Sequence, residues 1–331
     1  MRLCLRRREF IAAMGGAVAW PLTTRAQQGN RVRRIGVLAG DQNDLVWKTN
    51  FSAFTQALAD LGWTAGRNVR MEPRWHGGDI NRIREFAKEL VGLQLDIILT
   101  NGTPTTVALQ RETRTIPIIF AGAGDPVAGG IVERLDHPSG NVTGFANYEA
   151  PLGGKWLELV SEIAPGLKRA AIMFNPDTGP VSAHMPSFEA AAGSLKVAPI
   201  MAPVHDDVEI EKAFTALGRE PGGGLVVMPD VFTSAHRAQI ILAAARNNVP
   251  VVYALSFFPR YGGLLSYGPD PVDIYRRSAS YVDRILRGAK PGDLPVQFPT
   301  KFQMVVNRKT ATALGLAIPP SIMLRADEVI E

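Results

Sequence analysis

The sequence predicts an α/β protein with two doubly wound parallel sheets. From residue 33 onward, short runs of β-branched residues alternate with longer segments whose apolar residues recur at helical spacing. The same alternation starts again after Phe145, which indicates a second sheet with its own helices. The chain has 331 residues, more than one hydrophobic core usually organises. We therefore expect two lobes.

The first half is expected to contain five strands and three helices. The strands are predicted at residues 34–39, 69–74, 95–100, 116–120 and 142–145, and the helices at 47–61, 80–90 and 103–112. In the first helix, Phe51, Phe54 and Leu58 share one face. In the third, Thr103 is a good N-cap and Pro104 suits the first helical position, so its start is well specified.

The second half repeats this pattern and is followed by a different tail. Strands are predicted at 169–174, 196–202, 224–228 and 250–254, and helices at 151–163, 181–194, 207–218 and 233–247. The tail adds a strand-like segment at 263–267, a long amphipathic helix at 270–287 and an extended segment at 301–306. Because these additions follow a complete second half, we expect the chain to return and complete the first lobe.

The first 26 residues have the features of an export signal. Basic residues come first, an apolar run covers residues 10–22, and Ala26 stands at a plausible cleavage point. The apolar run is too short to span a bilayer permanently. Arg7 and Arg8 resemble the twin-arginine pattern that routes folded proteins out of the bacterial cytoplasm. The sequence therefore predicts an exported protein.

Removal of this segment changes both the charge and the cysteine content of the chain. Residues 1–26 hold five arginines and Glu9, a net charge of +4, so the formal charge falls from +5 to +1. The basic balance is thus no indication of a nucleic-acid partner. The single cysteine, Cys4, lies in the same segment. The mature chain is expected to have neither a disulfide nor a thiol nucleophile.

Polar residues and glycines gather where the predicted strands end. The candidates are Asp41 and Asn43 after the first strand, Asn101, Gly102 and Thr103 after the third, Ala123, Gly124 and Asp125 in a glycine-rich turn after the fourth, and Asn175 and Asp230 in the second half. The carboxyl ends of strands are where open α/β sheets bind ligands. Two such edges facing each other predict a cleft between the lobes.

No motif for catalysis, metal or cofactor binding accompanies these residues. The GxG at 122–124 lacks the third glycine of a dinucleotide fingerprint, and neither GxxxxGK[ST] nor GxSxG occurs. The histidines show no HxxxH spacing, and the trio His205, Asp206 and Asp207 directly precedes a predicted helix, where Asp ordinarily acts as a cap. We therefore expect no metal, no cofactor and no enzymatic activity.

A binding role needs fewer special groups. Gly102 and Thr103, at a helix N-terminus, offer backbone N–H groups and a hydroxyl to a carboxylate. Asp125 or Asp230 could face an ammonium group, with helix capping or a place in a loop as the equal alternative. The aromatic residues near predicted turns, which either supply an apolar wall or pack in the core, are Trp47, Tyr148, Phe257 and Tyr267.

Several long segments resemble a known family. The segments GDPVAGGIVERLDHPSGNVTGF (124–145) and KWLELVSEIAPGLKRAAIMFNP (155–176) resemble the uncharacterised ABC-type substrate-binding proteins related to bacterial tryptophan and tyrosine binders. The segments 262–316 and 318–331 resemble the same proteins. The resemblance covers essentially the whole mature chain.

The resemblance implies the type I periplasmic-binding fold, in which two α/β lobes close on a ligand about a three-segment hinge. It implies crossings just after Phe145, near 255–263 and near 302–307. The first lobe would then hold residues 31–145 and 264–301, and the second 146–263 and 302–331. Ligand contacts in the family at strand ends carry over to Asn101 to Thr103, Ala123 to Asp125, Asn175 and Asp230.

The function expected from the resemblance is that of a periplasmic, monomeric solute-binding protein. It would deliver a small organic solute, such as an amino acid or an aromatic or carboxylate compound, to an ABC permease, with no nucleic-acid partner. One alternative is a sensory binding module that presents ligand occupancy to a membrane receptor. The other is a cleft enzyme, for instance a hydrolase or racemase, which the missing catalytic motifs disfavour.

Overall fold

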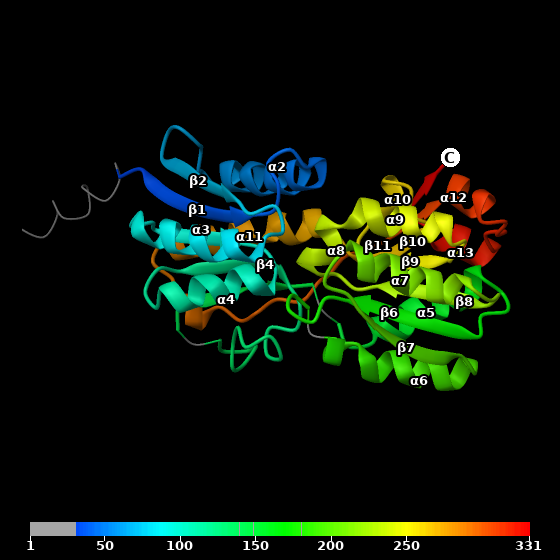
Figure 1. The fold of residues 1–331 in the computed structure, drawn as a ribbon. Coiled ribbons are helices and arrows are strands. Elements are labelled where there is room, and N and C mark those ends of the chain that lie inside the picture. Colours follow the sequence, from blue (N-terminus) through cyan, green and yellow to red (C-terminus); the bar gives the residue numbers. More distant parts are fainter. Residues whose placement is uncertain (1–30, 139, 148, 180) are drawn as a thin grey trace, which may run out of the picture.

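The computed structural model describes residues 31–331 except 139, 148 and 180, so the predicted export signal lies outside the described residues. Figure 1 shows two lobes side by side, each a sheet covered by helices, with the chain passing between them more than once. No helix in the described part of the chain is both long and apolar enough to cross a membrane.

The first lobe is a five-stranded sheet in the order β2-β1-β3-β4-β5, with all neighbours parallel. Its strands are β1 (Arg33–Ala39), β2 (Val69–Trp75), β3 (Ile97–Thr100), β4 (Ile118–Ala123) and β5 (Val142–Ala146). The helices α2 (Leu45–Asp60) and α11 (Pro271–Leu286) share an apolar cluster on one face, and α3 (Ile80–Gly92) and α4 (Thr103–Glu112) share another on the opposite face. The predicted alternation of strands and helices is confirmed here.

The second lobe is a seven-stranded sheet in the order β12-β11-β10-β9-β8-β6-β7, parallel except between β10 and β11. Its strands are β6 (Arg169–Phe174), β7 (Ala198–Pro203), β8 (Gly223–Val227), β9 (Val251–Tyr253), β10 (Leu265–Pro269), β11 (Phe302–Asn307) and β12 (Glu328–Ile330). Its helices are α5 (Leu152–Ile163), α6 (Met185–Leu195), α7 (Asp207–Gly218), α8 (Val231–Ala235), α9 (Arg237–Arg246), α10 (Phe257–Arg260), α12 (Arg308–Ala313) and α13 (Pro320–Arg325).

The sequence of β6 explains why it lies inside its sheet. Ala170 and Ile172 pack in the cluster under α5 and α6, whereas Ala171 and Met173 pack in the cluster under α7 and α9. Successive side chains of a strand point to opposite faces, so an apolar run without alternation is buried on both. The same reasoning applies to the fully buried residues of β3 and β9.

The chain returns to the first lobe later than expected. The resemblance predicts the segment from residue 264 in the first lobe, but β10 pairs with β9 and β11 in the second sheet, and only α11 then packs on α2. The apolar pattern of a buried strand does not tell which sheet the strand joins, because both sheets offer the same environment. The crossings lie after Ala146, between Pro269 and Pro271, and between Gln297 and Phe302.

The crossing segments are hydrogen-bonded to each other. The backbone N–H of Asp270 donates to the carbonyl of Lys301 at 2.9 Å. The N–H of Ala146 donates to the carbonyl of Gln297 at 2.8 Å, and the N–H of Gln297 donates to the carbonyl of Gly144 at 2.9 Å. The hinge is therefore made of paired backbone rather than of three independent linkers.

Two predicted helices are divided in the structure. The segment 181–194 is a short 3-10 turn, η2 (Val181–Ala183), followed by α6, which has Pro186 in its first turn. The segment 233–247 is two helices, α8 and α9, which meet at His236. The break at His236 directs α8 toward the first lobe, as Figure 1 shows.

Candidate functional site

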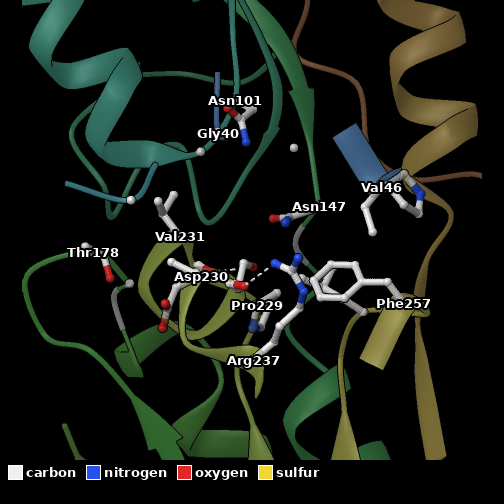
Figure 2. Close-up of a pocket in the computed structure, with 18 of the residues that line it drawn as sticks. Gly40, Val46, Asn101, Asn147, Thr178, Pro229, Asp230, Val231, Arg237 and Phe257 are labelled. Carbon is white, nitrogen blue, oxygen red and sulfur yellow. Dashed lines mark hydrogen bonds between the residues drawn. The ribbon is translucent and has the colours of Figure 1, made fainter. Parts of the chain in front are cut away.

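A cavity of about 690 Å³ lies between the two lobes and is lined by residues of both. It is formed by the carboxyl ends of the strands, as the sequence predicts for facing sheet edges. Figure 2 shows Asn101 and Asn147 pointing into this space from the first lobe and Arg237 from the second. The expected site residues that line it are Asp41, Asn101, Gly102, Thr103, Gly124, Asp125, Asp230 and Phe257.

Three expected site residues lie away from the cavity, each for a local reason. Asn43 is exposed in the turn after β1, where its N–H donates to Asp41. Ala123 is the last residue of β4 and points into the core of the first lobe. Asn175 is buried and both ends of its amide are engaged, with Nδ2 donating to the carbonyl of Val204 and Oδ1 accepting from the N–H of Asp177. Tyr148 lies outside the described residues.

The start of α4 differs from the expected cap. Gly102 is the N-cap, with φ 78°, and no side chain caps the helix, so Thr103 is the first helical residue rather than the cap. A glycine is favoured there because its φ is positive. It is also favoured because a Cβ on Gly102 would lie 2.9 Å from Cγ2 of Val231 in the second lobe. The uncapped N–H groups of α4 remain at the edge of the cavity.

The three candidate carboxylates that line the cavity, Asp41, Asp125 and Asp230, all hold backbone in place, Asp41 by accepting from the N–H of Asn43. Oδ1 of Asp125 accepts from the N–H groups of Val127 and Ala128. Asp230 caps α8 through a 2.6 Å bond from the N–H of Thr233 and also accepts from the N–H of Asn175. Burial, which outweighs these bonds, raises the pKa of Asp230 from 3.8 to about 6. Capping and cavity lining are thus combined in Asp230.

Four cavity residues that are not among the strand-end candidates each carry a buried nitrogen or oxygen atom without a hydrogen-bond partner in the described part of the chain. They are Trp47 (Nε1), His76 (Nε2), Asn147 (Oδ1) and Thr178 (Oγ1), and the expected residue Asn101 shares this property through Oδ1. Buried polar atoms normally have partners, so such a group around one cavity is typical of a ligand site. His76, Asn147 and Thr178 also follow strand ends, so the rule that selected Asn101 would have found them.

His76 is neutral and presents a donor. Burial lowers the pKa of His76 to about 4. Its Nδ1 lies 3.0 Å from the N–H of Gly78 and accepts that proton. In a neutral imidazole one nitrogen accepts and the other donates, so Nε2 of His76 carries the hydrogen. The cavity therefore has a buried N–H donor at this position and another at Trp47.

One end of the cavity is aromatic. Trp47 meets Tyr275 edge to face, with ring centroids 5.5 Å apart, and Phe257 and Tyr261 line the same cavity from the second lobe. The guanidinium of Arg237 lies 4.8 Å from the ring of Tyr261 and 5.9 Å from that of Phe257. Figure 2 shows the ring of Phe257 beside this guanidinium. This end suits a flat apolar group.

The lining is negatively charged overall. It holds four aspartates, Asp41, Asp44, Asp125 and Asp230, and one arginine, Arg237. Asp44 and Arg237 form an ion pair with an N···O distance of 3.0 Å. The charge left for a ligand is therefore negative, which favours a cationic group such as an ammonium. In the described part of the chain, no group of three or more His, Cys, Asp or Glu residues is arranged to hold a metal ion.

The trio His205, Asp206 and Asp207 serves separate local purposes. Asp206 caps α7 by accepting from the N–H of Glu209, as expected for Asp before a helix. His205 pairs with Glu209, and Asp207 lies 2.6 Å from Nδ1 of His236.

Comparison with known proteins gives a consistent result. A family model described as "ABC transporter substrate binding protein" matches residues 43–330. A tyrosine-binding protein of Clostridioides difficile is 25% identical over 263 residues, which is 80% of this chain and 75% of that protein.

Solved structures share the fold. A conserved domain protein from Vibrio cholerae is 26% identical with a TM-score of 0.83, covering 90% of this chain and 100% of that one. A domain from Streptococcus pneumoniae in complex with L-Trp is 24% identical with a TM-score of 0.82, covering 90% and 99%. These matches confirm the resemblance seen in the sequence and the two-lobed α/β fold of type I periplasmic binding proteins.

Proposed function

Since the chain belongs to the family of ABC transporter substrate-binding proteins, we propose that it binds an amino acid with a flat side chain between its lobes and delivers it to an ABC permease. The observation that carries the proposal is the cavity itself. Both lobes line this cavity, which has aromatic side chains at one end, buried polar atoms without hydrogen-bond partners in the described part of the chain, and more carboxylates than cationic groups.

The charged groups of an amino acid match different parts of the lining. Asp125 and Asp41, together with Oδ1 of Asn101 and of Asn147, are the acceptors offered to an ammonium group. The N–H groups at the start of α4 and the Nε2–H of His76 are donors offered to a carboxylate. A zwitterionic amino acid supplies an ammonium group for these acceptors and a carboxylate for these donors.

The flat side chain would lie at the aromatic end. Trp47 and Tyr275 of the first lobe and Phe257 of the second supply ring surfaces there. Two relatives support an aromatic ligand, since one is named for tyrosine and the other was crystallised with L-Trp. We propose tryptophan or tyrosine as the first ligands to test.

Delivery to a permease requires that the protein leave the cytoplasm. Residues 1–26 supply the proposed export signal, with the twin-arginine pattern at Arg7 and Arg8. The mature protein would act as a monomer in the periplasm, and the proposed role requires no chemistry from the cavity. Closure of the lobes on the ligand would be the event that the permease recognises.

Calorimetric titration of the mature chain (27–331), unfolded and refolded to remove any co-purified ligand, tests the proposal. We expect L-tryptophan or L-tyrosine to bind, with tryptamine and indole-3-propionate about tenfold weaker or more, because each lacks one charged group and leaves its partners unpaired. Phe257→Ala should weaken binding, whereas Leu324→Ala, which alters an exposed side chain of α13 outside the cavity, should not. Absence of binding by every compound would refute the proposal.

A further inference from the structure

We infer that the ion pair between Asp44 and Arg237 is a latch that holds the two lobes closed over the cavity. Asp44 precedes α2 in the first lobe, and Arg237 begins α9 in the second. Their closest N···O distance is 3.0 Å, and both residues line the cavity. An ion pair that joins the lobes directly is made on closing and lost on opening.

Arg237 is positioned for this contact by its own lobe. Its Nη1 donates to the carbonyl of Ser234 at 3.0 Å, and its guanidinium packs over the rings of Tyr261 and Phe257. Its side chain is 23% exposed. A planar guanidinium fixed in this way loses little side-chain freedom when it pairs with a carboxylate.

Asp44 uses its two oxygens for different tasks. Oδ1 accepts from the N–H of Val46 and caps α2, and Oδ2 faces Arg237. Its side chain is 15% exposed, so solvent screens the pair only partly. An asparagine at position 44 could keep the cap through its oxygen while placing an NH₂ group against the guanidinium. The latch can therefore be removed without removing the cap.

Other contacts between the lobes accompany the ion pair. A Cβ on Gly78 would lie 2.7 Å from Cβ of Ala235, so the loop after β2 and helix α8 touch across the interface. Val46 of the first lobe packs against an apolar cluster of the second. The ion pair is thus flanked by packed surface that exists only while the lobes are together.

The test measures lobe separation in the ligand-free mature protein. That chain contains no cysteine, because Cys4 precedes residue 27, so Lys88→Cys in α3 and Leu324→Cys in α13 can carry a dye pair for single-molecule energy transfer. Asp44→Asn and Arg237→Gln should each raise the ratio of open to closed molecules roughly fivefold, as expected for a pair contributing about 1 kcal/mol. The double variant should open no further than either single variant.

Salt and a matched cap provide the controls. Raising the ionic strength should open the wild-type protein and leave Asp44→Asn unchanged, since only the former has the pair to screen. Asp206→Asn, which alters the exposed N-cap of α7 outside the cavity, should leave the distribution unchanged. Equal distributions in all variants, or additive effects in the double variant, would overturn the inference. Because no ligand is added, this outcome is independent of the proposed binding function.

Discussion

Replacement of Asp230 by Asn should change the way the stability of the protein depends on pH. Asp230 is buried, with 8% of the residue exposed, and its carboxyl group accepts N–H bonds from Thr233 at 2.6 Å and from Asn175 at 3.3 Å. Burial nevertheless dominates and raises its pKa to about 6. The folded protein therefore holds a proton on this group over a pH range in which the unfolded chain has released it.

The sign and size of the effect follow from linkage. Below pH 3.8, both folded and unfolded chains carry the proton, and Asp230 adds no pH dependence. Between 3.8 and about 6 only the folded state retains it, so the free energy of unfolding falls as pH rises. Above about 6 the buried carboxylate is charged, at a total cost of about 3 kcal/mol, since each pKa unit corresponds to about 1.4 kcal/mol.

Urea denaturation of the mature protein at intervals from pH 4 to pH 7.5 measures this cost. Over this range the stability of Asp230→Asn minus that of the wild type should rise with pH by about 2.5 kcal/mol, because a small part of the effect is already present at pH 4. The variant also loses the carboxylate oxygen that accepts from the N–H of Asn175. That loss shifts the difference in stability by a constant and leaves its slope with pH unaffected. Asp206→Asn, at the exposed cap of α7, serves as the matched control and should not show the rise. A difference independent of pH would refute the reasoning.

Two further predictions concern packing. Trp156→Phe should lower the free energy of unfolding by about 2 kcal/mol, because the 2.6 Å hydrogen bond from its Nε1 to the carbonyl of Tyr267 is lost and a void is left. Denaturant titration measures this change, and an unchanged midpoint would contradict the prediction. Gly144→Ala should lower the free energy of unfolding by about 3 kcal/mol, since its Cβ would lie 2.2 Å from the carbonyl oxygen of Phe120. Gly193→Ala, in open space on α6, should raise the free energy of unfolding by about 0.5–1 kcal/mol. Equal effects of the two changes in the same assay would be inconsistent with this packing.

The alternation of apolar runs predicts most of the fold because buried strands and amphipathic helices have distinct periods. It cannot assign a strand to one of two sheets. The sequence places β10 in the first lobe, whereas it lies in the second, where its antiparallel partner β11 comes more than thirty residues later. Only the pairing of strands that are distant in the sequence decides which of the two sheets such a strand joins.

The site was partly predictable for a similar reason. Asn101, Gly124 and Asp125 follow strand ends, and all three line the cavity. The rule fails for Ala123 because β4 continues through it, with a shift in register between Ala121 and Ala123. Arg237 gives no sequence signal, since the segment 233–247 is predicted as one helix, whereas the structure divides it at His236, next to Arg237.

The hydrogen bonds among the crossing segments limit how the lobes can move. Gln297 bonds to the backbone on both sides of Phe145, and Asp270 bonds to Lys301, so the connections form a narrow ribbon of paired backbone. Sliding of one crossing segment past another would break these hydrogen bonds. We therefore expect the lobes to rotate about a single axis. The angle between their outer faces would then differ between the ligand-bound and the ligand-free protein. A partner that contacts both lobes could distinguish these two conformations without contacting the ligand.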